Sequence, residues 1–277
     1  MDYVHGYDKA AGQRLGDQAD ALTRLLHDGT RYRADDHVLE VGCGVGSQTR
    51  ILLKNNPGTR FTCVDQSESS ITTAKQCLRE FDSRLQFALG DARSLEYGDA
   101  TFDHVFICFV LEHVARPLDV LAEVKRVLRP GGTVTVIEGD HGSVIMSPPS
   151  AAADAAIDCL VTLQRISGAD AMIGRRLYPL LGEANFSDVV VQPRQVYADG
   201  ADNELRNSFT RKTFTAMIEG VRDAAIANGI ISPDAFDNGI SALNDAADGD
   251  GVFAYTFFKA VGHAPVDPTT LALADSV

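Results

Sequence analysis

The chain has 277 residues, 45% of them hydrophobic, which is enough for one large domain with a buried core. Its formal net charge is −13 and no basic run compensates for it, which argues against nucleic acid as a partner. The five cysteines occur singly, without a Cys-x-x-Cys or Cys/His cluster, so we expect no metal site, reduced thiols and a cytoplasmic location. No apolar run approaches the length of a membrane span, and we expect no membrane partner.

The first 30 residues precede the first predicted strand. Ala19, Leu22, Leu25 and Leu26 recur at helical spacing and predict an amphipathic helix. The segment before it, Tyr-Val-His-Gly-Tyr-Asp, is aromatic and titratable. We expect it to fold over a ligand pocket as a lid, with Tyr7 facing a cation or the substrate. The alternative is a frayed segment, or one that packs against a second subunit of a homo-oligomer.

A glycine-rich turn between a strand and a helix is the central feature of the sequence. Residues 36–41 form an apolar, β-branched run that predicts a short buried strand, and the apolar run 51–53 indicates a helix. Between them lie Gly42, Gly44 and Gly46. Such glycines let the backbone approach a ligand closely, so the pattern predicts a nucleotide-binding unit. The spacing differs from the Gly-x-Gly-x-x-Gly of dinucleotide enzymes.

The next two predicted strands each lead to an acidic residue at or just after their carboxyl end. Residues 60–64 predict the second strand, which ends at Asp65, where a carboxylate can accept hydrogen bonds from both ribose hydroxyls. The alternative is an acid that only supports a turn. Ser67 predicts the N-cap of the following helix. Residues 85–89 predict the third strand, and in the Gly90-Asp91-Ala92 that follows, the carboxylate can accept the adenine amino group.

The fourth predicted strand, residues 102–110, is almost continuously apolar, as expected of a central parallel strand. It leads into Leu111-Glu112-His113-Val114. Because ligands bind beyond the carboxyl ends of parallel strands, His113 is well placed to meet a substrate and to move a proton near neutral pH. The alternative is a histidine that only closes the pocket through a hydrogen bond.

A helix over residues 117–128 and the turn Arg-Pro-Gly-Gly at 129–132 precede the fifth predicted strand, 133–137. The strand leads into Glu-Gly-Asp-His-Gly-Ser at 138–143. Three titratable residues at the carboxyl edge of a sheet make a functional-site candidate, and the alternative is a polar loop.

The second half of the chain predicts helices over residues 150–165 and 174–186 and a sixth strand over 189–196. We expect Arg175 and Arg176 to be solvated rather than paired. About 50 residues, with helical runs at 211–228 and 233–247, then separate the sixth strand from the last, at 252–260, although a hairpin needs only a few residues. We therefore expect a cap that shapes the acceptor pocket.

These elements divide the chain into five segments. They are an N-terminal lid and helix (1–30), a core (31–198), a cap insertion (199–250), the final core strand (251–263) and a loose tail (264–277).

Taken in order, these motifs resemble those of the class I S-adenosylmethionine (SAM)-dependent methyltransferases. The Leu-Glu-His segment is similar to that of the ubiquinone/menaquinone-type small-molecule methyltransferases, and the Leu-Arg-Pro-Gly-Gly run is frequent in the superfamily. The resemblance implies a Rossmann-like α/β fold with a seven-stranded, mostly parallel sheet. Helices cover both faces, and the antiparallel last strand is inserted through a hairpin with strand six.

The resemblance further implies SAM as cofactor, S-adenosyl-L-homocysteine (SAH) as product, and no metal. The residues that match cofactor-binding positions are Glu40, Gly42, Gly44, Gly46, Gln48, Asp65, Gln66, Asp91, Ala92 and Phe109.

No Asn-Pro-Pro-Tyr-type motif follows the fourth strand and no basic face is evident, which favours a small-molecule acceptor. The cluster at 138–143, the N-terminal aromatic segment and the insertion look like features of microbial natural-product methyltransferases, some of which methylate carbons of indole-type or prenyl-indole compounds. The alternative is O- or N-methylation of a small aromatic or quinone-type metabolite. We expect His113 to be the base, with Asp140 and His141 next, and Tyr7 to orient the substrate or contact the sulfonium.

Two other classes of protein remain as alternatives. Tyr255 and Lys259 reproduce the Tyr-x-x-x-Lys of short-chain dehydrogenases, but they stand in an aromatic, β-branched strand near the end of the chain, so we interpret the match as coincidence. A non-catalytic protein with this fold, which binds a partner or acts as a scaffold, is the other.

Overall fold

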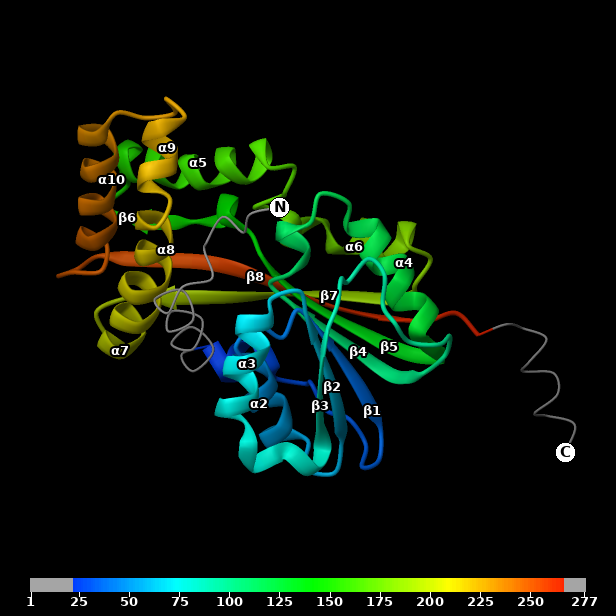
Figure 1. The fold of residues 1–277 in the computed structure, drawn as a ribbon. Coiled ribbons are helices and arrows are strands. Elements are labelled where there is room, and N and C mark those ends of the chain that lie inside the picture. Colours follow the sequence, from blue (N-terminus) through cyan, green and yellow to red (C-terminus); the bar gives the residue numbers. More distant parts are fainter. Residues whose placement is uncertain (1–21, 267–277) are drawn as a thin grey trace, which may run out of the picture.

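The computed structural model describes residues 22–266 (Figure 1). Tyr7 and the rest of the predicted lid segment lie outside the described residues, as does most of the predicted tail. Residues 22–27 are helical, in agreement with the apolar periodicity of this region. Among the described residues, no helix combines the length and apolar character required to cross a membrane.

A single mixed sheet forms the centre of the described chain. Its strands are β1 (His37–Val41), β2 (Arg60–Asp65), β3 (Leu85–Leu89), β4 (Phe102–Cys108), β5 (Leu128–Gly139), β6 (Ile145–Ser147), β7 (Ser187–Ala198) and β8 (Val252–His263). The order is β3-β2-β1-β4-β5-β8-β6, with β7 also paired to β8. Strands β1 to β5 are parallel, whereas β8 runs antiparallel to β5, β6 and β7. The predicted Rossmann-like sheet with an antiparallel last strand is confirmed.

The described residues form eight strands rather than the expected seven. The additional strand is β6, three residues long, which pairs Met146 with Phe253 near the start of β8. So short a strand has no periodicity of its own, and it forms because β8 extends far enough beyond β5 to offer it a partner.

Helices connect the strands and cover the sheet. They are α2 (Ser47–Asn55), α3 (Glu68–Cys77), α4 (Pro117–Val127), α5 (Ala151–Ile166), α6 (Leu177–Glu183), α7 (Asn203–Leu205), α8 (Ala216–Glu219), α9 (Arg222–Ala227) and α10 (Pro233–Asp245). Ser67 caps α3 as predicted, accepting a hydrogen bond from the Ser70 N–H at 3.2 Å. Pro117 opens α4, where its missing N–H costs nothing.

The two faces of the sheet carry separate hydrophobic clusters, because alternate residues of a strand point to opposite sides. On one face, Phe106 of β4 packs in a cluster with Leu26 of the N-terminal helix and Leu52 of α2. On the other, Val105 belongs to a cluster with Leu121 of α4 and Leu181 of α6. Helices therefore cover both faces, as predicted.

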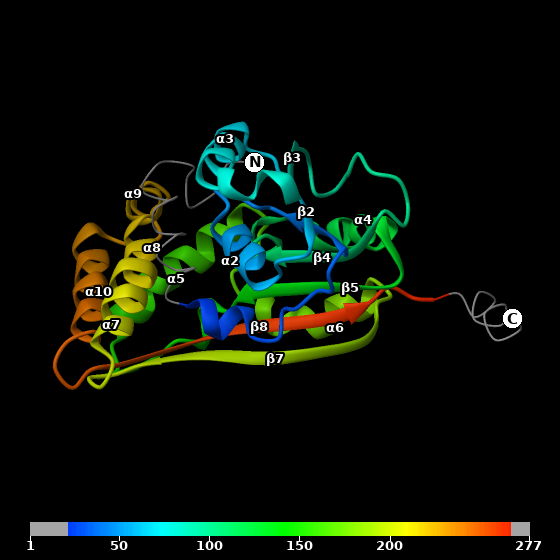
Figure 2. The same ribbon diagram turned by 90° about the horizontal axis from the view of Figure 1, so that it is seen from below.

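A helical cap lies at one end of the molecule, and Figures 1 and 2 both show α5, α8, α9 and α10 grouped there. The run predicted as one helix over 211–228 is divided into a π-helical segment (Arg206–Thr215), α8 and α9, since Gly220 ends α8. Helix α10 packs closely on α5: a Cβ on Gly239 would collide with the carbonyl oxygen of Ala152. The cap therefore includes α5, a helix outside the predicted insertion.

Candidate active site

The glycine turn joins β1 to α2 and uses its glycines in different ways. Gly42 and Gly44 have φ values of +74° and +52°, which side chains rarely adopt. A Cβ on Gly42 would collide with the Val110 side chain, so this glycine lets the turn pack against the segment after β4. A Cβ on Gly44 would have no atom of residues 22–266 within 4 Å, so the backbone at Gly44 faces open space in this part of the chain. The turn thus presents bare backbone to a ligand.

Asp65, at the end of β2, is tied to this turn. Its carboxylate accepts hydrogen bonds from the Gly44 N–H and the Ser67 N–H, both at 2.8 Å. Burial raises the pKa of Asp65, and these backbone N–H groups oppose the shift. The structure therefore brings Asp65 and Gly44 together, and Gln66 follows directly as an exposed residue.

Glu40 lies beneath the turn at the end of β1 and is 2% exposed. Its carboxylate accepts a hydrogen bond from the Thr49 hydroxyl of α2 at 2.6 Å and faces the Cys63 thiol at 3.4 Å. Burial raises the pKa of Glu40 to about 7, against the opposing effect of these hydrogen bonds. The carboxyl group therefore changes charge near neutral pH.

Gln48 hydrogen-bonds to a residue that the sequence did not single out. Its side-chain oxygen lies 2.5 Å from Nε2 of His27, at the end of the N-terminal helix. The His27 ring also stacks on Phe106, with centroids 5.6 Å apart, and burial lowers the pKa of His27 to about 4. His27 thus ties the N-terminal helix to both the sheet and the first turn of α2.

The residues predicted near the adenine have partners of their own. Asp91 is bound by the Arg93 guanidinium, with its shortest contact at 2.6 Å, and these hydrogen bonds lower the pKa of Asp91. Ala92 is half-buried beside it. Phe109 has a positive φ of 57°, and its ring lies 5.5 Å from that of Phe257. The carboxylate of Asp91 is therefore already engaged by Arg93.

A second group of titratable side chains lies after β4 and β5. Glu112 is 6% exposed, and one of its oxygens lies 3.2 Å from His113 Nε2, while the other lies 3.6 Å from His141 Nε2. Burial raises the pKa of Glu112, but His113 and His141 outweigh it and hold the pKa well below its usual range. His141 Nδ1 faces the Tyr255 hydroxyl at 3.3 Å. The structure thus brings His113 and His141 together through Glu112, which the sequence did not indicate.

Glu138 fixes the turn that carries Glu112 and His113. One oxygen of its fully buried carboxyl group accepts the N–H groups of Val110, at 3.0 Å, and Leu111, at 2.7 Å. Burial and the neighbouring charge of Glu112 raise the pKa of Glu138 well above its usual range. Glu138 is therefore an anchor between β5 and the turn after β4.

Asp140 has a set of partners that occupies both carboxylate oxygens. Arg175 donates to them at 2.7 and 2.8 Å, and the Gly142 N–H donates at 3.1 Å. The expectation that Arg175 and Arg176 are solvated is wrong, since Arg176 also pairs, with Asp170 at 2.6 Å. An exposed guanidinium meets a buried carboxylate here because Ile173–Arg176 forms a short helical turn next to β5.

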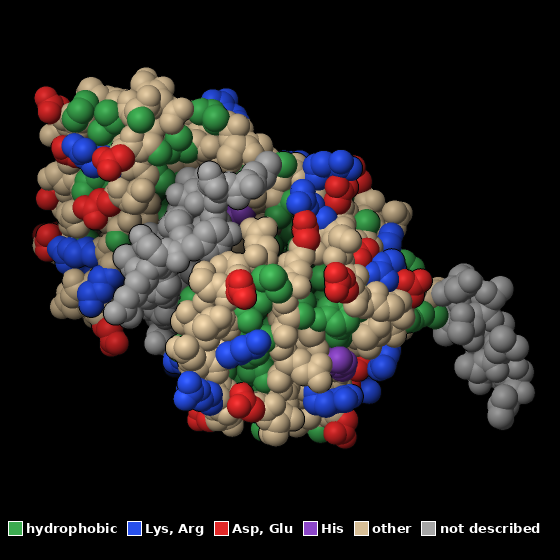
Figure 3. Space-filling view, in the orientation of Figure 1, with side chains coloured by type: hydrophobic (Ala, Val, Ile, Leu, Met, Phe, Trp, Pro, Cys, Tyr) green, Lys and Arg blue, Asp and Glu red, His purple; other side chains and the backbone are tan. Residues whose placement is uncertain are grey.

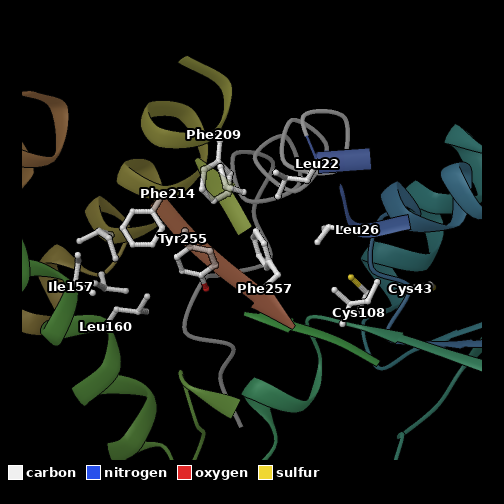
Figure 4. Packing of buried hydrophobic residues seen from close by; sticks show 14 of the residues in the cluster. Leu22, Leu26, Cys43, Cys108, Ile157, Leu160, Phe209, Phe214, Tyr255 and Phe257 are labelled. Atoms are coloured by element: carbon white, nitrogen blue, oxygen red, sulfur yellow. The ribbon is translucent and has the colours of Figure 1, made fainter. Parts of the chain in front are cut away.

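Aromatic side chains adjoin this titratable group on the cap side. Tyr255 lies 4.7 Å from Phe257 and 5.4 Å from Phe214, centroid to centroid, and Phe214 lies 6.2 Å from the His141 ring. Figure 4 shows Tyr255 between Phe214 and Phe257, with its hydroxyl pointing away from Phe209 and Phe214. The surroundings of His141 are therefore aromatic on one side and charged on the other.

The structure adds two further observations. Among residues 22–266, no three His, Cys, Asp or Glu side chains are arranged to hold a metal ion. On the face in Figure 3, Lys and Arg side chains are interspersed with Asp and Glu side chains, without a broad basic patch among the described residues.

Comparison with known proteins agrees with this geometry. Residues 39–136 match the family model of the methyltransferase domain. The ubiquinone/menaquinone biosynthesis C-methyltransferase UbiE of Paracoccus denitrificans is 33% identical over 146 residues, which cover 49% of this chain and 58% of that protein. The 27-O-demethylrifamycin SV methyltransferase of Amycolatopsis mediterranei is 32% identical over 153 residues, 54% of this chain and 55% of that protein.

Among solved structures, the fold is similar to that of phosphoethanolamine N-methyltransferase 2 of Haemonchus contortus, with a TM-score of 0.58 and 18% identity over 89% of this chain and 53% of that chain. The chain spans less than two thirds of the length of the curated relatives it matches. The fold is that of the Rossmann-like methyltransferases, and the domain match lies within its parallel half. In sequence, residues 39–136 are similar to the class I SAM-dependent methyltransferases.

Proposed function

We propose that the chain transfers a methyl group from SAM to a small-molecule acceptor and leaves SAH. The observation that carries this proposal is the position of the Glu112, His113 and His141 group, which follows β4 and β5 at the same sheet edge as the glycine turn and Asp65. This arrangement supports a cofactor and an acceptor bound side by side at one edge, where the methyl group can be positioned for transfer.

The residues of this edge fit SAM. The open space over Gly44 and the buried carboxylate of Asp65 suit a ribose beside bare backbone. Glu40, Gly42, Gly44, Gly46 and Gln48 would hold the methionine end, Asp65 and Gln66 the ribose, and Asp91, Ala92 and Phe109 the adenine. Bound SAM supplies an electrophilic methyl group on its sulfonium.

The chain's own side chains then position the acceptor and take its proton. His113, whose side chain is 14% exposed, is the proposed base, with His141 next. Asp140 is better suited to hold the turn of His141 than to take a proton, because Arg175 and Gly142 already engage both of its oxygens.

We further propose that the acceptor is an electron-rich carbon of an indole- or isoprenoid-type natural product of secondary metabolism. The aromatic side chains around His141 support an apolar acceptor, since ring faces stabilise a cation formed by attack from carbon. The C-methyltransferase named among the relatives supports the same reaction type. O-methylation of a small aromatic or quinone-type metabolite is the second candidate, favoured by the rifamycin relative, and N-methylation stands beside it.

A cytoplasmic location belongs to this proposal, as does a homo-oligomer formed through the N-terminal segment or the cap. Light scattering of the purified chain measures the oligomeric state.

Calorimetric titration with SAM, SAH and NADH tests the cofactor. We expect micromolar binding of SAM and SAH and none of NADH, and binding of NADH alone would overturn the proposal. Mass spectrometry after incubation with SAM and a panel of indoles, prenylated aromatics and quinols then tests the acceptor. Tight SAM binding without turnover over the whole panel favours a non-catalytic protein.

Substitution of His113 tests the proposed base. If His113→Ala retains a rate within about threefold of wild type, which corresponds to roughly 0.7 kcal/mol of barrier, the assignment of the base is wrong.

A further inference from the structure

We propose that Glu112 is a shared carboxylate that joins His113, His141 and Tyr255 into one proton relay, whose two imidazoles titrate as a coupled pair. Glu112 and Tyr255 are positioning residues that act through the histidines. The inference rests on the proposed function for its catalytic meaning, but the relay itself is a property of the protein alone.

The first support is the arrangement of the two imidazoles. They come from separate turns, after β4 and after β5, and the Nε2 atom of each lies near a different oxygen of Glu112, at 3.2 Å for His113 and 3.6 Å for His141. The three side chains are 14%, 4% and 8% exposed for His113, His141 and Glu112. Removed from bulk water in this way, a single negative charge interacts strongly with a proton on either ring.

The second support is Tyr255, which occupies the other nitrogen of His141. Burial raises the pKa of the Tyr255 hydroxyl well above its usual range, so the hydroxyl keeps its proton and can donate a hydrogen bond to His141 Nδ1, 3.3 Å away. His141 then carries its own proton on Nε2, the nitrogen that faces Glu112. The backbone makes room for this contact: a Cβ on residue 139 would collide with the Tyr255 hydroxyl, and residue 139 is glycine.

The surrounding charges restrict the relay to one carboxylate. In the part of the chain that the structure describes, the titratable groups near Glu112 are His113 on its own turn, Cys108 of β4, Glu138 of β5, Asp140 and His141 of the next turn, and Tyr255 of β8. Asp140 is neutralised by Arg175, and burial and the charge of Glu112 raise the pKa of Glu138 well above its usual range. Within residues 22–266, Glu112 is the carboxylate that lies closest to both histidines and can balance a proton on either.

The single negative charge of Glu112 can balance the positive charge of only one protonated imidazole. The first imidazole to take a proton becomes an imidazolium stabilised by Glu112, and the second must take its proton next to an already compensated pair. The two protons therefore bind in separate steps. In the reaction, a bond from the acceptor to hydrogen breaks, its electron pair stays on the acceptor, and a new N–H bond forms on His113, whose positive charge Glu112 balances.

Nuclear magnetic resonance of the full chain, labelled with ¹⁵N-histidine, tests the relay without an acceptor. His113→Gln and His141→Gln assign the two rings. We expect the wild-type pair to titrate in two steps separated by about one pH unit or more, and neutral His141 to carry its proton on Nε2. Independent titration of the two rings, or a neutral His141 protonated on Nδ1, would overturn the proposal.

Two conservative variants separate positioning from general packing. Glu112→Gln should lower the upper step of the pair by about one pH unit or more, whereas Glu183→Gln, at an exposed glutamate of α6, should leave it in place. Tyr255→Phe should shift neutral His141 toward the Nδ1 tautomer, whereas Tyr178→Phe, at a residue 64% exposed, should not. If the two histidines of Glu112→Gln titrate as they do in wild type, Glu112 is not the shared carboxylate. If that variant does not fold, the wild-type titration and the tautomer of His141 in Tyr255→Phe test the proposal instead.

SAH serves as the probe that separates this proposal from the proposed function. If the two histidines of wild type titrate as a coupled pair but the protein does not bind SAH, the relay stands and the SAM-dependent activity is overturned. Wild type that binds SAH while its histidines titrate independently retains the activity and overturns the relay.

Discussion

Glu40→Gln should make the protein more stable at neutral and alkaline pH. The carboxyl group is buried under the glycine turn, and its pKa rises from an ordinary 4.5 to about 7. Below pH 4.5 the group is protonated in both the folded and the unfolded chain, so it contributes no difference. Between pH 4.5 and 7 the unfolded chain loses this proton and the folded chain keeps it, so wild type is progressively destabilised as pH rises. Above pH 7 the full penalty applies, about 3 kcal/mol from a shift of this size.

Urea unfolding of wild type and Glu40→Gln between pH 4 and 8 measures this effect. The other titrating groups are common to both proteins and largely cancel in the difference, which should grow by about 3 kcal/mol in favour of Glu40→Gln across the stated window. Glu183→Gln, at an exposed position, is the control and should follow wild type. Parallel pH curves for wild type and Glu40→Gln would show that the Glu40 charge is not destabilised by burial.

Three further changes have defined outcomes. Gly42→Ala should lower the free energy of unfolding in urea by about 1–3 kcal/mol more than Gly29→Ala does. Both glycines have a φ near +75°, but only a Cβ at position 42 collides with Val110, so equal losses would exclude that collision as the cause. Asp65→Ala should weaken SAH binding in calorimetry by about 1 kcal/mol or more, because a charge-assisted hydrogen bond is lost, and an unchanged dissociation constant removes Asp65 from the site. As pH falls from 6.5 to 4, the free energy of unfolding of wild type should fall by about 3 kcal/mol relative to that of His27→Gln, because only the unfolded chain takes a proton on His27 in this range. A difference in urea unfolding that stays constant with pH would contradict a buried, neutral His27 ring.

The sequence predicts the parallel part of the sheet well, because each of those strands is a short apolar run bounded by turn residues. The third strand is found at its predicted residues, 85–89. The fifth was predicted over 133–137 but extends over Leu128–Gly139, since the Pro-Gly-Gly turn continues as part of the strand and Leu128 pairs with Phe102 across a register shift. A local pattern does not reveal such an extension, because the partner strand provides it.

Some contacts in the site follow from the local sequence, and others depend on packing between distant parts of the chain. The glycine turn and Asp65 follow predicted strands directly, so their meeting at one edge was foreseeable from strand order. The contact between His141 and Tyr255 was not, because it depends on the register of β8 against β5, and Tyr255 had drawn attention only through its Tyr-x-x-x-Lys spacing. The pairing of Arg175 with Asp140 likewise joins two turns whose packing no periodicity encodes.

Strand β8 comes last in sequence among the described strands but lies inside the sheet. It is inserted between β5 and β7, and it pairs residues as distant in sequence as Thr133 and His263. During synthesis, β5 and β7 are complete long before β8 leaves the ribosome, so two strand edges stay unpaired in the nascent protein. Contacts of such long sequence separation form slowly, because a large loop must close before they are gained. Docking of β8 is therefore the step at which refolding should be slowest and aggregation should compete, and it simultaneously completes the core, the cap and the surroundings of His141.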